Sequence, residues 1–262
     1  MKDKIGCFIT NNRIISDNDI EEVLKLLSVK EGQVFVQRMG INGVRMELDF
    51  FPRINPVKTS NELGFDINIF QKKIGVKKLL IADMDSTIIN VECIDELADF
   101  RGVKKQVQAI TNQSMQGKIN FSDSLIKRVK LLKGLSFENL NECFETKVSI
   151  NPGAETLVKT MNACGTATVL VSGGFTFFAE KIERMVGFER SYANDFVYEQ
   201  DILTGELQKP ILCGKRKLAI MKELAEKLNI DLEDVIAVGD GANDIDIIRN
   251  AGLGVSFFGK PK

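Results

Sequence analysis

Three short apolar runs in this 262-residue chain are predicted to be buried strands: Leu79–Ala82, Thr166–Val171 and Asp234–Val238. Unbroken apolar runs of this length are typical of strands that are covered on both faces. Polar residues follow each run directly or after one glycine. We therefore expect an α/β fold, in which ligands bind beyond the carboxyl ends of the strands.

The segment between the first two strands, at about residues 93–150, has a helical pattern instead. Apolar residues from Ile94 to Val103 recur at helix spacing, and Gly102 is placed to end one helix. We expect this insert to form a helical cap, because a lid over a site can exclude water and carry residues that select the substrate.

The chain is predicted to divide near Gln71–Val76 into two domains, residues 1–74 and 75–262. The first is expected to be a small βαββ unit that ends in a loop marked by Pro52 and Pro56. Its predicted elements are the strands Ile5–Thr10, Gln33–Arg38 and Val44–Phe50 and a helix from Asp17 to Leu27. It contains no glycine-rich phosphate loop and no carboxylate pair.

Two carboxylates, Asp83 and Asp85, follow the first strand of the second domain. Side chains two residues apart in an extended chain share a face, so both would enter one small volume. Two anions this close are tolerated if a cation neutralises them, or if one carries a proton, as a general acid beside a nucleophile does. A helix cap is the alternative, and this segment alone does not decide between them.

Polar groups also follow the other two strands. Asp240, Asn243 and Asp244 lie in a glycine-rich turn, although an Asx-turn would use the same residues. Ser172-Gly173-Gly174 precedes an expected helix, and such a junction offers a hydroxyl and N–H groups to an anion. Together, the three strand ends predict a Mg²⁺ site that holds a phosphate.

Composition narrows the chemistry further. The chain has no histidine, which excludes histidine phosphotransfer, Ser-His-Asp catalysis and the usual zinc sites. With 35 basic and 36 acidic residues, its net charge of −1 favours neither nucleic acid nor a membrane as partner. The five cysteines form no C-x-x-C pair and are expected to be reduced, mostly buried thiols. Without a leader or membrane-spanning run, a cytoplasmic protein is predicted.

The motifs DMDST at residues 83–87, VSGGF at 171–175 and GDGANDIDI at 239–247 resemble those of haloacid dehalogenase superfamily phosphatases. The segments 91–97 and 117–129 resemble the serine-recognition cap of its phosphoserine phosphatase family. The similarity begins near Lys78. It implies a Rossmann-like parallel sheet with an inserted helical cap, and Mg²⁺-dependent hydrolysis of O-phosphoserine in serine biosynthesis. It also implies that residues 1–74 are a degenerate ligand-binding or regulatory domain of the ACT-like kind, although a plain packing role is the simpler interpretation.

The resemblance assigns roles to the residues at the strand ends. Asp83 would be the nucleophile that forms an aspartyl-phosphate, and Asp85 the general acid and then the base. The metal ligands it implies are Asp83, the backbone carbonyl of Asp85, Asp240 and Asp244. The phosphate-binding groups it implies are Ser172, Gly173, Asn243 and the N–H of Met84.

Four residues are implied to contact the serine part of the substrate. Glu92 would pair with its ammonium group and Arg128 with its carboxylate, although surface ion pairs are the plainer interpretation of both. Met115 and Phe121 would shield the site, or belong to the core.

A lysine is implied to neutralise the nucleophile and the phosphate. The run Lys215-Arg216-Lys217 offers two candidates. Spacing to the GDGAND motif favours Lys217, with Lys215 as the alternative, and a solvated basic turn is the alternative to both.

Other functions share some of these features. Another phosphatase of the superfamily, or a phosphotransferase acting on a small phosphorylated amino acid or alcohol, would use the same core residues. A signalling receiver domain also surrounds a phosphorylated Asp with acids, magnesium and a lysine, but Asp85 and the helical cap argue against it. An inactive relative is disfavoured by the intact Asp83, Asp85, Lys217 and Asp240. The sequence does not indicate an oligomeric state.

Overall fold

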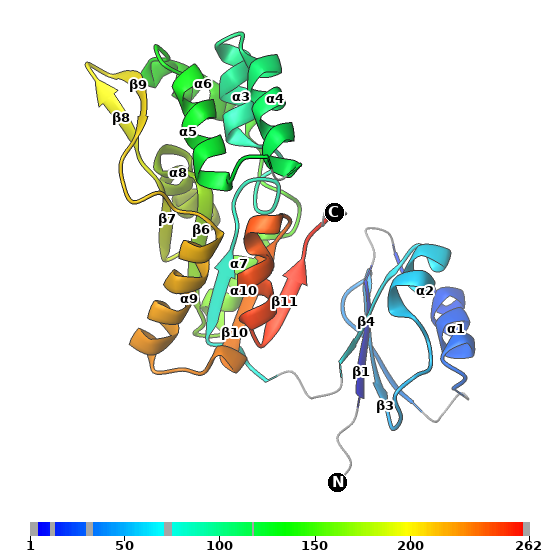
Figure 1. Ribbon diagram of the computed structural model, residues 1–262. Helices are drawn as coiled ribbons and strands as arrows, with labels where there is room; N and C mark the ends of the chain where they lie inside the picture. Colours follow the sequence, from blue (N-terminus) through cyan, green and yellow to red (C-terminus); the bar gives the residue numbers. More distant parts are fainter. Residues whose placement is uncertain (1–4, 11–13, 30–33, 71–74, 117, 259–262) are drawn as a thin grey trace. The chain divides into compact units, whose positions relative to one another are not determined.

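The computed structural model describes residues 5–10, 14–29, 34–70, 75–116 and 118–258 (Figure 1). The chain forms two units, Met1–Gly75 and Val76–Lys262. Cys7, Cys93 and Cys143 are buried free thiols, as the sequence predicts for most of the cysteines, whereas Cys164 is exposed. Every helix among the described residues is too short or too polar to span a bilayer.

A five-stranded parallel sheet forms the centre of the larger unit. Its order is β11-β10-β5-β6-β7, and every neighbouring pair is parallel. The strands are β5 (Leu79–Ala82), β6 (Ala167–Phe175), β7 (Arg190–Asn194), β10 (Val235–Gly239) and β11 (Leu253–Ser256). The predicted α/β fold with a parallel sheet is confirmed. Because all strands run the same way, the polar residues after β5, β6 and β10 meet at one edge.

Helices cover both faces of this sheet because each central strand is apolar on both sides. Leu80 and Leu170 pack in one cluster with Phe178 of α8 (Thr176–Val186) and with α7 (Ala154–Ala163). Ile81 and Val171 pack in a second cluster with α9 (Gly214–Leu228) and α10 (Ile245–Asn250). Truncating any of these buried leucines or isoleucines to alanine would cost about 2–5 kcal/mol.

The insert after β5 is helical, as predicted. Its helices are α3 (Cys93–Phe100), α4 (Lys104–Met115), α5 (Phe121–Leu131) and α6 (Phe137–Lys147). Asn120 and Ser136 cap α5 and α6 by accepting backbone N–H groups. A hairpin of β8 (Phe196–Glu199) and β9 (Ile202–Leu207) contacts α5. Figure 1 shows the four helices together, beyond the carboxyl end of β5.

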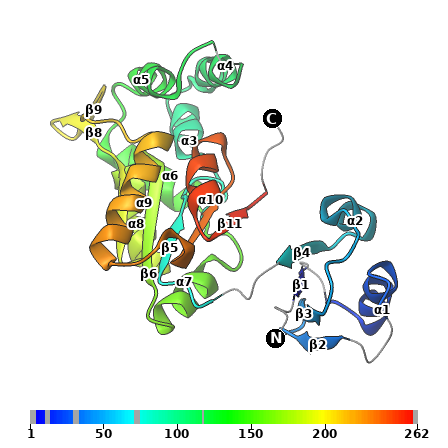
Figure 2. The same cartoon turned by 60° about the horizontal axis from the view of Figure 1, so that its bottom comes forward.

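The smaller unit has one helix and one strand more than the predicted βαββ pattern. It contains β1 (Ile5–Thr10), α1 (Asp17–Leu26), β2 (Phe35–Arg38), β3 (Gly43–Leu48), α2 (Pro56–Leu63) and β4 (Asp66–Phe70). The antiparallel order β2-β3-β1-β4 is the ferredoxin-like split βαβ arrangement. Both helices lie on one side of this sheet (Figure 2).

The prediction of a loop at Pro56 was wrong, because this residue begins the helix α2. The Asn55 side chain accepts the N–H of Lys58 and caps the helix, and Pro56 occupies its first turn. A proline loses no hydrogen bond there, because the first N–H groups of a helix have no intrahelical partner. Gly64, with φ +70°, ends the helix, and the buried residue Ile67 then marks β4.

Candidate active site

Asp83 is held at the centre of the sheet edge. Its N–H donates to the carbonyl of Val238 on β10 at 2.9 Å. Its Oδ1 accepts the N–H of Met84 at 2.8 Å and lies 2.7 Å from the Nζ of Lys217. The carboxylate is therefore buried, oriented and paired with a cation.

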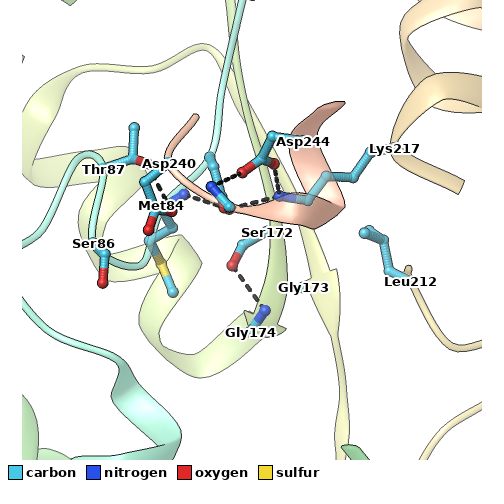
Figure 3. A network of polar contacts seen from close by, with 12 residues as sticks. Met84, Ser86, Thr87, Ser172, Gly173, Gly174, Leu212, Lys217, Asp240 and Asp244 are labelled. Carbon is cyan, nitrogen blue, oxygen red and sulfur yellow. Dashed lines mark hydrogen bonds and ion pairs between the residues drawn. The ribbon is translucent and has the colours of Figure 1, made fainter. Parts of the chain in front are cut away.

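Lys217 comes from the first turn of α9 and is fully buried. Its Nζ lies 2.7 Å from Oδ1 of Asp83 and 2.7 Å from Oδ1 of Asp244 (Figure 3). Burial lowers the pKa of this ammonium group, but the two carboxylates raise it by more, so Lys217 stays charged. Lys215 is exposed. The structure thus brings Lys217, and not Lys215, to Asp83.

Three carboxylates can hold a metal ion here. One oxygen each of Asp83, Asp240 and Asp244 lies within 4.8 Å of the others. Burial, followed by the charge of Asp83, raises the pKa of Asp244 to about 7. One lysine leaves this cluster with an excess of negative charge, and hard oxygen donors suit Mg²⁺. A Cβ at Gly239 would lie 2.5 Å from Cγ of Asp244, so the turn packs closely around the cluster.

Asp85 differs from Asp83 because it has no lysine beside it among the described residues. Its Oδ1 accepts the N–H of Cys93 at 3.1 Å. Burial raises its pKa to about 8, with the charges of Glu92 and Asp83 adding to the effect and the Cys93 hydrogen bond opposing it. Asp85 can therefore carry a proton at neutral pH.

The end of β6 lies beside the residues that follow β5 and β10 and completes this edge of the site. Ser172 is fully buried, and its hydroxyl accepts the N–H of Gly174 at 2.8 Å. A Cβ at Gly173 would lie 3.0 Å from the ring of Phe121, so the cap touches the sheet at this point. The strand continues to Phe175, and α8 begins at Thr176, near the predicted position.

A cavity of about 590 Å³ lies between these strand ends and the cap. Eight predicted residues line it: Asp83, Asp85, Glu92, Phe121, Arg128, Gly173, Asp240 and Asn243. Ser172, Lys217 and Asp244 are fully buried and are not among the residues that line the cavity. Met115 ends α4, and its side chain lies outside the described part of the chain.

The cap side of the cavity is charged. Glu92 accepts the hydroxyl of Ser86 at 2.8 Å. Arg128 donates its Nε to the carbonyl of Ser124 at 3.4 Å. Burial lowers the pKa of the Arg128 guanidinium, and the nearby charges of Asp95, Glu92 and Asp85 oppose this change. A guanidinium beside several carboxylates can bind a zwitterion.

Two residues that line this cavity each have a buried polar atom without a hydrogen-bond partner among the described residues. Within the described residues, the buried side-chain atoms without a hydrogen bond are Oδ1 of Asp95 and Oγ of Ser124. Both residues line the cavity. Burying an unpaired polar atom is unfavourable, so these two atoms mark the cap side of the cavity as a place where the packing leaves polar groups unsatisfied.

A family model described as haloacid dehalogenase-like hydrolase matches residues 80–249. The chain belongs to this family. A probable phosphoserine phosphatase of Schizosaccharomyces pombe is 42% identical over 188 residues, which cover 71% of this chain and 63% of the relative. The chain therefore spans less than two thirds of that relative.

Solved structures of haloacid dehalogenase-like proteins are similar to the structure of this chain. A family hydrolase from Salmonella enterica serovar Typhi has a TM-score of 0.86 at 28% identity, covering 98% of this chain and 90% of the other. A substrate-bound phosphoserine phosphatase complex has a TM-score of 0.66 at 39% identity, covering 71% and 89%. The resemblance to phosphoserine phosphatases predicted from the motifs is confirmed.

Sequence reasoning missed Asp95 and Ser124 as residues that line the cavity. The spacing of both residues in the sequence could have indicated them. Asp95 follows Glu92 by three residues, and Ser124 precedes Arg128 by four, so each shares a helix face with a predicted substrate contact. Polar residues on cap helices otherwise resemble a solvated surface.

Proposed function

We propose that this chain is a Mg²⁺-dependent phosphoserine phosphatase, which hydrolyses O-phospho-L-serine as the last step of serine biosynthesis in the cytoplasm. The observation that carries the proposal is a single cavity lined by Asp83, Asp85, Glu92 and Arg128. A small molecule with a phosphate at one end and a zwitterion at the other matches these groups. The phosphoserine phosphatases among the relatives support the same activity.

Asp83 is the nucleophile. Its carboxylate attacks phosphorus, an Asp83–phosphorus bond forms, and the bond from phosphorus to the serine oxygen breaks. Lys217 and the N–H of Met84 hold Oδ1, so the carboxylate is oriented before the substrate arrives. Asp85, protonated by virtue of its raised pKa, donates its proton to the leaving serine oxygen.

Asp85 then acts a second time. As a carboxylate it accepts a proton from water, whose oxygen attacks the phosphorus of the aspartyl-phosphate. The Asp83 carboxylate and inorganic phosphate are released, and Asp85 is protonated again, ready for the next cycle. One residue therefore serves as acid and base in turn.

Asp83, Asp240 and Asp244 would hold Mg²⁺, which would supply positive charge for the phosphate oxygens. The fit rests on the three converging carboxylates. Asn243 and the Gly173 backbone line the cavity where they can orient the phosphate. Without a divalent cation, the carboxylate cluster repels a phosphate dianion.

Selectivity is assigned to the cap. Arg128 grips the substrate carboxylate, while Glu92 binds the ammonium group. Phe121 contacts the Gly173 position and separates the site from solvent. Residues 1–74 are proposed as a regulatory domain.

The test is phosphate release from L-phosphoserine with and without Mg²⁺, compared with phosphothreonine and an aryl phosphate. Asp83→Asn is the control for the nucleophile. Mg²⁺-dependent release selective for phosphoserine, and lost in the variant, is the expected result. Release from the aryl phosphate alone would refute the roles of Glu92 and Arg128. A phosphorylated alcohol formed with added glycerol would indicate a phosphotransferase instead.

A further inference from the structure

Asn194, at the end of β7, joins two segments from distant parts of the chain. Its side chain is 2% exposed. Its Nδ2 lies 3.0 Å from the carbonyl oxygen of Gly173, 3.2 Å from that of Gly174 and 3.3 Å from that of Leu212. Its Oδ1 accepts the N–H of Leu212 at 2.6 Å. Both ends of the amide are therefore used.

The two joined segments carry different parts of the site. Gly173 and Gly174 line the cavity. Leu212 leads into α9, whose first turn carries Lys217, and the N–H of Lys217 donates to the carbonyl of Cys213 at 2.9 Å. Figure 3 shows Leu212, Lys217 and the Ser172–Gly174 strand end in one view. The Asn194 amide thus links the Gly173-Gly174 end of β6 to the helix that holds the lysine.

The chemistry of the contacts requires an amide. The two segments present three carbonyl oxygens and one N–H, which need both a donor and an acceptor from one small side chain. A carboxylate would place an oxygen against the carbonyls, and an apolar side chain would leave buried carbonyls unpaired.

Both segments are packed closely against the site. A Cβ at Gly174 would lie 2.5 Å from Oδ2 of Asp85 and 3.0 Å from Oγ of Ser172. On the other segment, a Cβ at Gly214 would lie 2.8 Å from the carbonyl oxygen of Asn243. A displacement of either segment would therefore reach groups that line the cavity.

We propose that Asn194 is a positioning residue, which fixes the Gly173-Gly174 end of β6 and Lys217 at the separation that a bound phosphate requires. It touches no reacting atom and acts through the segments it joins. The inference rests on the proposed function only in that the cavity binds a phosphate group. Misplacement of catalytic groups by about 1 Å can cost about 100-fold in rate.

The test compares Asn194→Ala with Asn162→Ala. Asn162 is a matched control because its amide also joins two segments, donating to the Gly187 carbonyl at 2.7 Å and accepting the Thr168 hydroxyl at 2.8 Å. It does not line the cavity. Both variants lose a bridging amide, but only one is attached to the site.

We expect Asn194→Ala to lower kcat/KM about 100-fold for phosphoserine and for an aryl phosphate alike. The KM and the inhibition constant of inorganic phosphate should both rise, while the preference between the two substrates stays unchanged because the cap is intact. Asn162→Ala should change none of these constants. Unchanged KM and phosphate inhibition in Asn194→Ala, or an equal rise in Asn162→Ala, would overturn the proposal.

A second variant and a binding measurement complete the test. If Asn194→Ala does not fold, Asn194→Ser keeps a small uncharged side chain that can donate to one carbonyl, and it carries the same comparison. Calorimetric binding of inorganic phosphate in the presence of Mg²⁺ needs no turnover. Weaker phosphate binding in the variant therefore supports the positioning role even if phosphoserine is not the substrate, and equal binding refutes it.

Discussion

Gly174 lies directly against Asp85, so that a Cβ on the glycine would come within 2.5 Å of Oδ2 of the acid. Gly174 also donates its N–H to the Ser172 hydroxyl at 2.8 Å. The end of β6 therefore fixes the position of the group assigned to proton transfer. The glycine is required there for close approach, and its φ is not positive.

Gly174→Ala should lower kcat strongly, by about 100-fold, because Asp85 is pushed away from the leaving oxygen. Overpacking of this kind costs about 1–3 kcal/mol in stability, so the protein should still fold. Steady-state kinetics and thermal unfolding check this prediction. Gly75→Ala is the control, because a Cβ there meets nothing within 4 Å. Equal kinetics in the two variants would contradict the assignment.

Lys217 and Lys215 should respond differently to the same substitution. Lys217→Met removes the cation between Asp83 and Asp244, leaving buried carboxylates uncompensated, which costs about 3–5 kcal/mol. Activity should fall by about 100-fold or more, as for the loss of a preorganised charge. Lys215→Met, at an exposed position, should change neither quantity measurably. The measurements are phosphate release and denaturant unfolding; a comparable loss in Lys215→Met would reverse the assignment.

The strand ends were predictable because apolar runs identify buried strands, and parallel strands bring their polar neighbours to one edge. Choosing between Lys215 and Lys217 was harder. Residues two apart on a helix point to different sides, so the choice depends on how α9 is rotated against the sheet. Asn194 could not be found from sequence, because its four contacts join segments about 20 residues away on either side of it.

The missed helix α2 has a different explanation. Asn55 and Pro56 form a valid helix start, but proline also marks loops, and only the residues after the proline separate these two meanings. The cap residues Asp95 and Ser124 were missed because the sequence does not show which face of a cap helix lies over a cavity. In both cases tertiary packing decides between two locally reasonable interpretations.

Removal of metal should make stability depend on pH. In EDTA, the folded-state pKa values of Asp85 and Asp244 stand at about 8 and about 7, above their ordinary range near 4. The folded state then binds more protons than the unfolded state between about pH 4 and 8, so the free energy of unfolding falls as pH rises through that window.

Mg²⁺ should oppose this loss by binding the ionised cluster of the folded protein. At a Mg²⁺ concentration of about 100 times the Kd, the stabilisation is about 2.7 kcal/mol. Urea unfolding at several pH values, in EDTA and in Mg²⁺, tests both effects. Asp240→Asn should weaken the response to Mg²⁺. A stability that rises with pH in EDTA would contradict the raised pKa values.

The cap should discriminate the two charged ends of the substrate through separate residues. Arg128→Lys loses the planar fork that matches a carboxylate, so kcat/KM should fall for phosphoserine and phosphoglycolate but little for O-phosphoethanolamine, which has no carboxylate. Glu92→Gln should show the opposite pattern, because it removes the charge that faces the ammonium group. Asp95→Asn should show the same pattern as Glu92→Gln. The amide keeps the shape of the carboxylate but removes the charge with which the unpaired Oδ1 would accept from the ammonium group.

Kinetics with the three substrates measure the contribution of each residue, and Lys127→Gln, at an exposed position on α5, is the control. Equal losses on all three substrates in Arg128→Lys would show that this residue supports the fold of the cap and does not bind the carboxylate.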